Sequence, residues 1–306
     1  MGFTLIKGTF HVVNYSPDGD SIRFCPDNRD LILGLQNGNR ARFNQRGHVQ
    51  TRIEAIDTLE THFTPPSGGT SALHQPLELA RLATEGLLDY LNIVNVVWDA
   101  AHRNVISADD GTSGYILARS VERNGRPVVF VFTGEAAEAD GADVFLGPER
   151  ISGSYNGSAL ASGLAYPTFY KGLFSDLRDI LSAQAAAARA ASLGVYATDG
   201  TQAGFSATTL GVITDDVPIL PKLFRRLSDY IVSTGSSIGF KEKLSEAQEP
   251  VLDLRTSNFT HFGHLIVQDA GSPRISLACL PEELVFDETI PQPGPVFAEV
   301  VGSDNQ

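Results

Sequence analysis

Alternating apolar and polar positions in the first part of the chain predict several β-strands. The apolar runs 10–13 and 22–24 lie on either side of Ser16-Pro17-Asp18-Gly19, which is typical of two strands joined by a turn. Positions 49–56 alternate and predict a further strand. One face of that strand would carry Val49, Thr51, Ile53 and Ala55, and the other Gln50, Arg52, Glu54 and Ile56.

Longer periodic runs predict helices between and after further strands. The predicted helices span about 76–91, 158–165 and 177–192, and the predicted strands 94–98, 115–119 and 128–132. Beyond residue 200, Pro218 and Pro221 open a helix at 222–232, and a short helix follows at 241–247. Strands are expected at 265–267, 275–279 and 284–286. Pro291, Pro293, Pro295 and Asp304 predict a poorly ordered acidic end.

Two short segments carry candidate chemistry. Asp18-Gly19-Asp20-Ser21 forms an acidic turn, and the run from Arg52 to Glu60 contains an Arg, an Asp at position 57 and a Glu at spacings of five and three. Carboxylates and a guanidinium are the groups that hold a divalent cation, activate water and neutralise a phosphate in phosphodiester cleavage. If Arg52 projects from a strand and 57–60 form the loop after it, these groups would converge on one cleft.

The two motifs, in this order, resemble those of the staphylococcal nuclease (thermonuclease) family, which carries D-G-D-[TS] followed by R-x5-D-T-x-E. The order of the predicted elements is similar over roughly residues 1–200. The resemblance implies an α+β domain, a five-stranded OB-type barrel with three helices. Residues 201–306 would form an acidic C-terminal α+β extension that is a separate small domain, a cover for the barrel or a contact between copies. The absence of a long linker at 195–201 favours packing against the barrel.

The resemblance also implies roles for single residues. Asp20 and Asp57, with the backbone carbonyl of Thr58, would bind a hard cation: calcium, with magnesium or manganese as alternatives. Glu60 would orient or deprotonate the attacking water, and Arg52 would grip the phosphate. The expected function is a metal-dependent nuclease that acts on single-stranded or frayed DNA or RNA and leaves 3′-phosphate ends. The alternative is a catalytically weak nucleic-acid-binding module.

The chain departs from the family at the second catalytic arginine. Ser113, within Gly111-Thr112-Ser113-Gly114, stands where that arginine would be. Loss of such a donor would reduce transition-state stabilisation by roughly several kcal/mol. We predict Arg119 as its replacement, ahead of Arg103; the alternative is that both are surface charges.

Charge limits the kind of nucleic-acid contact that we expect. The net charge is -13, with 23 basic and 36 acidic residues, which argues against a broad basic surface. Arg40, Arg42, Phe43 and Arg46 form a local exception that could follow phosphates and stack on a base, or could be the solvated edge of a hairpin. Tyr170 is expected to lie close to the terminal nucleotide, where the family places aromatic rings; the alternative is that its ring packs in the core or in a loop.

The remaining features bound the class of protein. The chain shows no basic-plus-apolar leader and no run long enough to cross a bilayer, so we expect a cytoplasmic protein. Cys25 and Cys279 form no metal motif; if they paired, they would tie the C-terminal part to the barrel. A transition-metal cluster of His261 and His264 with His62 or His74 is an alternative chemistry, but its spacing matches no strong zinc pattern.

Overall fold

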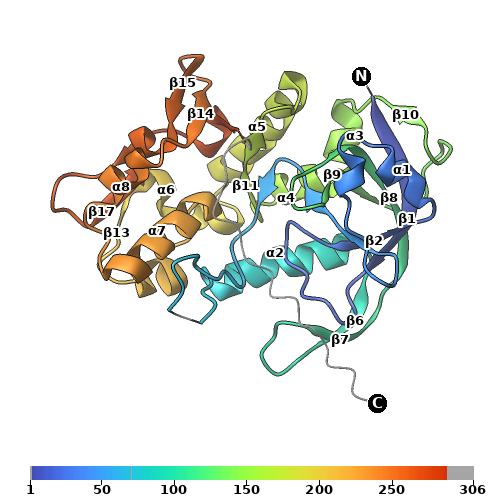
Figure 1. The fold of residues 1–306 in the computed structure, drawn as a ribbon, viewed down its shortest axis with the longest axis horizontal. Coiled ribbons are helices and arrows are strands. Elements are labelled where there is room, and N and C mark those ends of the chain that lie inside the picture. The colour runs from blue at the N-terminus through green and yellow to red at the C-terminus, as the bar shows by residue number, and fades with distance from the viewer. Residues whose placement is uncertain (1, 70, 288–306) are drawn as a thin grey trace.

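The computed structural model describes residues 2–69 and 71–287. The predicted acidic end with Pro291, Pro293 and Pro295 lies outside these residues. The fold is mixed α+β, with the strands of the first part on one side of the molecule and most C-terminal elements on the other (Figure 1).

The first part of the chain is built on a barrel-like sheet. Its strand order is β3-β2-β1-β8-β9-β4, and β10 pairs with β1, giving a seven-stranded sheet. The strands are β1 (Phe3–His11), β2 (Arg23–Pro26), β3 (Val49–Gln50), β4 (Arg52–Ile53), β8 (Thr112–Val121), β9 (Pro127–Thr133) and β10 (Asp143–Val144). The two ends of the path, β3 and β4, are separated in sequence by Thr51 alone. The chain therefore leads from one edge of the sheet to the other, and the barrel is nearly closed.

The predicted strand at 49–56 is present but broken. Thr51, Ile53 and Ala55 are buried, as the alternation predicts. Ala55 has a φ of 68°, in the left-handed region, so the chain turns there and β5 (Ile56–Asp57) leaves the barrel. The side chain of Asn156 accepts from the Val131 N–H at 3.0 Å and donates to the carbonyls of Glu54 (2.8 Å) and Val129 (3.1 Å), which satisfies backbone groups at the break.

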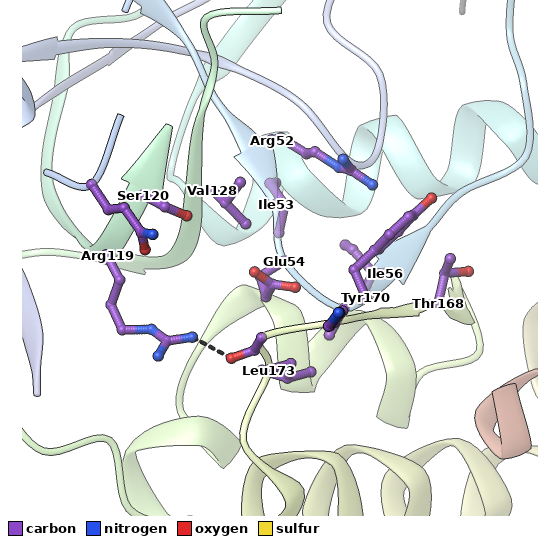
Figure 2. Close-up of a pocket in the computed structure, with 14 residues that line it drawn as sticks. Arg52, Ile53, Glu54, Ile56, Arg119, Ser120, Val128, Thr168, Tyr170 and Leu173 are labelled. Carbon is purple, nitrogen blue, oxygen red and sulfur yellow. Dashed lines mark hydrogen bonds between the residues drawn. The ribbon is translucent and has the colours of Figure 1, made fainter. Parts of the chain in front are cut away.

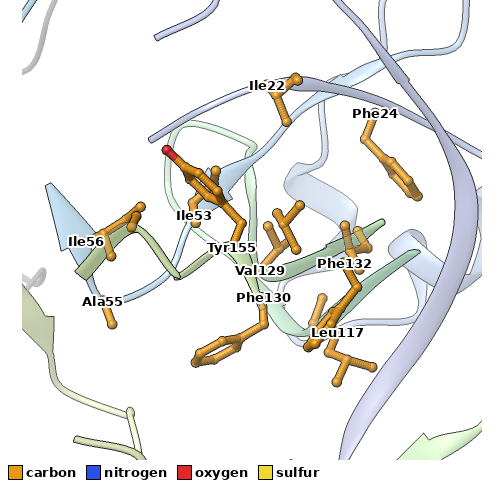
Figure 3. Packing of buried hydrophobic residues seen from close by; sticks show 14 of the residues in the cluster. Ile22, Phe24, Ile53, Ala55, Ile56, Leu117, Val129, Phe130, Phe132 and Tyr155 are labelled. Atoms are coloured by element: carbon orange, nitrogen blue, oxygen red, sulfur yellow. The ribbon is translucent and has the colours of Figure 1, made fainter. Parts of the chain in front are cut away.

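Helices cover this sheet and enclose its apolar interior. The predicted long helices occur as α2 (Leu77–Tyr90), α4 (Tyr155–Ala161) and α5 (Ser175–Ala190), with α1 (Arg29–Leu33), α3 (Pro148–Ser152) and the hairpin β6 (Val94–Trp98) and β7 (Val105–Asp109) as additions. Figure 3 shows Ile53, Val129 and Phe130 among the side chains of the core. The predicted count of five strands and three helices is wrong: the described residues before 200 contain five α-helices, and the sheet has seven strands.

The C-terminal part shares a core with the first part. Its helices are α6 (Gly200–Ala203), α7 (Pro221–Thr234) and α8 (Phe240–Glu246); its strands are β13 (Phe205–Ser206), β14 (Pro250–Asp253), β15 (Asn258–His261), β16 (Ile266–Val267), β17 (Arg274–Leu277) and β18 (Leu284–Phe286). Leu59, Phe63 and Tyr166 pack in one apolar cluster with Leu223 and Phe224 of α7. In addition, β12 (Phe169–Tyr170) pairs in parallel with β18, and β11 (Tyr166–Pro167) pairs with β5.

Two further expectations concern covalent links and membranes. Cys25 and Cys279 are both free thiols, so a disulfide between them does not form. None of the helices in the described residues is long and apolar enough to cross a bilayer.

Candidate active site

The acidic turn is fixed by the elements beneath it. The Ser21 hydroxyl donates to Asp18 at 2.6 Å, and the buried Tyr155 hydroxyl donates to the Gly19 carbonyl at 2.8 Å. A Cβ at Gly19 would lie 2.7 Å from the Cβ of Ala83, so only glycine lets the turn approach α2 this closely. The Ile53 N–H donates to the Asp20 carbonyl at 3.0 Å and joins the turn to β4.

The second motif is held beside the first. Asp57 lies in β5 opposite Tyr166, and not in the loop that the sequence predicts. The Thr58 N–H points to Oδ2 of Asp20 at 3.4 Å. The backbone of Glu60 exchanges two hydrogen bonds with Gln75, at 3.2 and 2.8 Å. The structure therefore brings Asp20, Asp57, Thr58 and Glu60 together, as the two motifs predict.

Crowding of carboxylates perturbs their protonation. Burial, followed by the charges of Asp18 and Asp57, raises the pKa of Asp20 well above its usual value. Burial is also the main cause that raises the pKa of Glu60 to about 7, with Asp57 adding to the shift and Arg225 opposing it. A carboxyl group with a pKa near neutrality can accept and release protons under physiological conditions.

Arg225, on α7, lies directly on these carboxylates. Its Nη1 donates to Oδ1 of Asp57 at 3.1 Å and its Nη2 to Oδ2 at 2.8 Å, a bidentate pair. Nη1 also donates to Oε1 of Glu60 at 2.5 Å. Burial alone would lower the pKa of Arg225, but Asp57 and Glu60 raise it well above its usual value. The two motifs give no sign of this residue, because it lies outside the part of the chain that carries them.

The helix that carries Arg225 is anchored on both sides of it. Arg226 donates to Glu249 through Nε at 2.7 Å and Nη2 at 2.9 Å, and Nζ of Lys222 lies 3.1 Å from the same carboxylate. All three side chains are buried. Gln75 connects this region to the second motif, because its Nε2 donates to the Ile219 carbonyl at 2.7 Å.

Arg52 lies against an aromatic ring, that of Tyr170. Its guanidinium carbon is 4.3 Å from the centre of the Tyr170 ring (Figure 2). Lys222 approaches the Tyr170 hydroxyl at 3.4 Å. Burial by itself raises the pKa of this phenol, but Lys222 and Arg52 together lower it below its usual value. Tyr170 is thus placed between two cations at the edge of the site.

Arg119 does not supply a guanidinium to the carboxylates. It lines, with Arg52, a cavity of about 180 Å³, where its Nη2 donates to the Gly172 carbonyl at 2.6 Å (Figure 2). Its guanidinium carbon packs over Phe174 at 4.2 Å and Phe3 at 4.9 Å from the ring centres. Arg119 as the replacement for the missing arginine therefore stays a prediction: it shares a cavity with Arg52 but makes its contacts with Gly172, Phe174 and Phe3. Ser113 is exposed on β8, opposite Thr9.

The predicted basic segment lies on the surface and contacts other elements. Arg40, Arg42 and Arg46 are exposed, and Phe43 is half-buried. Arg46 reaches the Val13 carbonyl at 3.4 Å, and Phe43 packs under a neighbouring guanidinium 5.3 Å from the ring centre. These contacts do not connect the segment to the carboxylate cluster.

The oxygen atoms at the site suit a hard cation, but those of Asp57 already accept hydrogen bonds from Arg225. Carboxylate and carbonyl oxygens are the ligands of calcium and magnesium, and Asp20, Asp57 and Thr58 supply them. However, both oxygens of Asp57 are engaged by Arg225. Nowhere in the described residues do three or more His, Cys, Asp or Glu side chains form a ready metal-binding group, and this includes the histidines considered above.

Comparison with known proteins adds no family to these observations. The sequence matches no model of a known protein family, and no curated protein matches it.

Proposed function

We propose that the protein is a divalent-metal-dependent nuclease built on an OB-type barrel, similar to the staphylococcal nuclease family. The observation that carries the proposal is the convergence of Asp20, Asp57 and Glu60. These residues come from two separate segments, and the Thr58 N–H to Asp20 contact of 3.4 Å joins the segments directly. Buried carboxylates repel one another, so their clustering lowers the stability of the fold. Such clusters are typical of functional sites.

Each residue has a distinct task in this proposal. Glu60, with a pKa of about 7, accepts the proton of the water that attacks phosphorus. Arg52 binds the phosphate through its two-pronged guanidinium, and Tyr170 holds that guanidinium in place. Cleavage between phosphorus and the 5′ oxygen leaves a 3′-phosphate. A calcium, magnesium or manganese ion bound by Asp20, Asp57 and the Thr58 carbonyl would supply positive charge for the phosphate.

Arg225, from the C-terminal part, places a guanidinium on Asp57 and Glu60. Its bond to Glu60 places it beside the proposed base. The C-terminal part is then a component of the site, although the motifs lie entirely before it.

Cleavage of single-stranded DNA and RNA in calcium, magnesium and manganese tests this proposal. Glu60→Gln keeps the shape of the side chain but cannot accept the proton, so the rate should fall by about 100-fold or more. Glu78→Gln, on an exposed position of α2, is the matched control and should leave the rate unchanged. Equal rates in the wild-type protein and Glu60→Gln would refute the assignment.

One observation favours the second candidate, a nuclease-fold binding module without appreciable activity. Arg225 pairs with both Asp57 and Glu60, so the protein itself supplies a counter-ion for these two carboxylates. Binding of single-stranded oligonucleotides with no metal-dependent cleavage would support this candidate instead.

A further inference from the structure

The carboxylates are engaged by a residue from outside the part of the chain that carries the motifs. Arg225 donates hydrogen bonds to both oxygens of Asp57 and to one oxygen of Glu60. A divalent cation that took Asp57 as a ligand would need one of those same oxygens, and its charge would lie against the guanidinium. The two positive groups therefore compete for this carboxylate.

Charge favours an exchange of one occupant for the other. Arg225 is in direct contact with Asp57 and Glu60, and the Thr58 N–H points from the same segment to Asp20. A single guanidinium supplies one positive charge against the negative charge that these three carboxyl groups can carry. A divalent ion would compensate more of it than a guanidinium does.

The helix itself does not have to move for this exchange. Leu223, Phe224 and Leu227 of α7 are fully buried, and Arg226 is tied to Glu249. The arginine side chain, in contrast, is long and has several rotatable bonds. Withdrawal of its guanidinium can therefore open Asp57 while α7 stays packed.

We propose that Arg225 and a divalent cation are alternative occupants of Asp57, so that the C-terminal part keeps the site closed until the cation displaces the guanidinium. This regulation rests on the proposed function, because it concerns the same carboxylates. It predicts that the cation binds more weakly than its ligands alone would allow, since it must first break a bidentate pair.

Calorimetric titration with Ca²⁺ and, separately, Mn²⁺ tests the exchange without any measurement of cleavage. Arg225→Gln removes the competing charge and should tighten binding of the ions by at least about tenfold. Arg225→Lys keeps the charge but loses the two-pronged geometry, so its affinity for the ions should lie between those of the wild-type protein and Arg225→Gln. Arg255→Gln is the matched control, because Arg255 pairs with Asp253 in the C-terminal part and should leave the affinity unchanged.

Circular dichroism identifies a variant that fails to fold, and Arg225→Lys then carries the test. Equal or weaker binding by the folded Arg225 variants would overturn the proposal, as would no binding of either ion by any variant. Tighter binding without cleavage would support the exchange and refute the nuclease assignment, so the two failures are distinguishable.

A second cavity carries an independent inference. It has a volume of about 120 Å³ and lies between the first turns of α2, the β6–β7 hairpin and the residues that follow Glu60. Its lining includes Trp98, His102, Arg81, Arg103, His62 and His74, and one acidic residue, Glu85. Pro17 and Thr61 also line it, so both segments that carry the carboxylates border it.

The lining combines an aromatic platform with cations. The Trp98 and His102 rings are stacked, with centres 4.7 Å apart and planes at 19°. Arg81 and Arg103 add positive charge, and burial together with Arg103 lowers the pKa of His62, so this imidazole is neutral and able to hydrogen-bond a base. Sites for whole drug-sized ligands measure about 300–1,000 Å³. This smaller cavity therefore suits one nucleotide of a longer nucleic-acid chain.

We infer that this cavity is a subsite for one nucleotide of a single-stranded nucleic acid, with the base against Trp98 and the phosphate near Arg81 and Arg103. Trp98 is the single tryptophan of the chain, so its fluorescence reports on this cavity alone. Adenosine 5′-monophosphate should quench it saturably, and adenosine should bind at least about tenfold more weakly.

Charge-neutral variants locate the phosphate. Arg81→Gln and Arg103→Gln should each lower the affinity for adenosine 5′-monophosphate, measured by the quenching, by about tenfold. Arg178→Gln, on α5, should leave this affinity unchanged. No saturable quenching, equal affinity for adenosine, or unchanged affinity in both cavity variants would each overturn the inference. The readout is binding, so it stands or fails separately from cleavage.

Discussion

Glu249→Gln would remove the anion that holds α7 in place. Glu249 is buried and accepts from Arg226 at 2.7 and 2.9 Å, with Lys222 at 3.1 Å. Burial alone would raise its pKa, but Lys222 and Arg226 lower it from 4.5 to about 2. Glutamine has the shape of the protonated acid, so the variant leaves two buried cations without their counter-ion.

The pKa shift sets the size of the effect. A lowering from 4.5 to about 2 is roughly 2.5 pH units, and at 1.36 kcal/mol per unit the ionised form stabilises the fold by about 3 kcal/mol. Breaking a buried ion pair costs a similar amount, about 3–5 kcal/mol. Because the folded-state pKa is depressed, this stability is present above pH 4.5 and is lost as the pH falls from about 4.5 to about 2.

Urea unfolding, followed by circular dichroism, measures this contribution. At pH 7 the free energy of unfolding of Glu249→Gln should be about 3 kcal/mol below that of the wild-type protein. As the pH falls from 4.5 to about 2, the unfolded wild-type chain binds a proton at Glu249 before the folded protein does, so the two curves should converge. A difference under about 1 kcal/mol at pH 7, or one that stays constant into acid, would refute the reasoning.

Three other predictions concern the barrel side of the site and the thiols. Gly19→Ala places a methyl group 2.7 Å from the Cβ of Ala83 and should cost about 1–3 kcal/mol in urea unfolding; an unchanged midpoint would contradict the close approach. Tyr155→Phe removes the hydroxyl that donates to the Gly19 carbonyl and should cost about 1–3 kcal/mol in the same assay. Burial raises the pKa of Cys279 to about 12, so a thiol reagent should modify Cys25 first in the native protein and both cysteines in urea, whereas equal native rates would contradict this.

Local patterns predicted the elements of the barrel because their causes are local. The alternation at 49–56 places Thr51 and Ile53 inside, and the helical periodicity at 76–91 gives α2. The left-handed Ala55 was not predictable, since no glycine marks the turn. Its conformation depends on Asn156, about a hundred residues later, which satisfies the backbone around the break.

The candidate site was predicted only as far as the two motifs reach. Asp20, Asp57 and Glu60 come together as expected, because each motif is short and the barrel joins them. Arg225 could not be assigned from periodicity, which predicts a helix at 222–232 but not what its polar side chains contact. A signal did exist: Arg225 and Arg226 are consecutive cations in a part of the chain with 7 basic and 14 acidic residues.

The contacts of α7 link the stability of the two parts of the chain. Carboxylates that crowd together destabilise a fold unless a positive charge lies among them. Arg225 provides that charge from the C-terminal part, and its helix is held by Glu249 and by a core that includes Leu59 and Phe63. The site and the C-terminal part therefore depend on each other: removal of the helix exposes the repulsion between Asp57 and Glu60, and removal of those carboxylates leaves Arg225 buried without a partner.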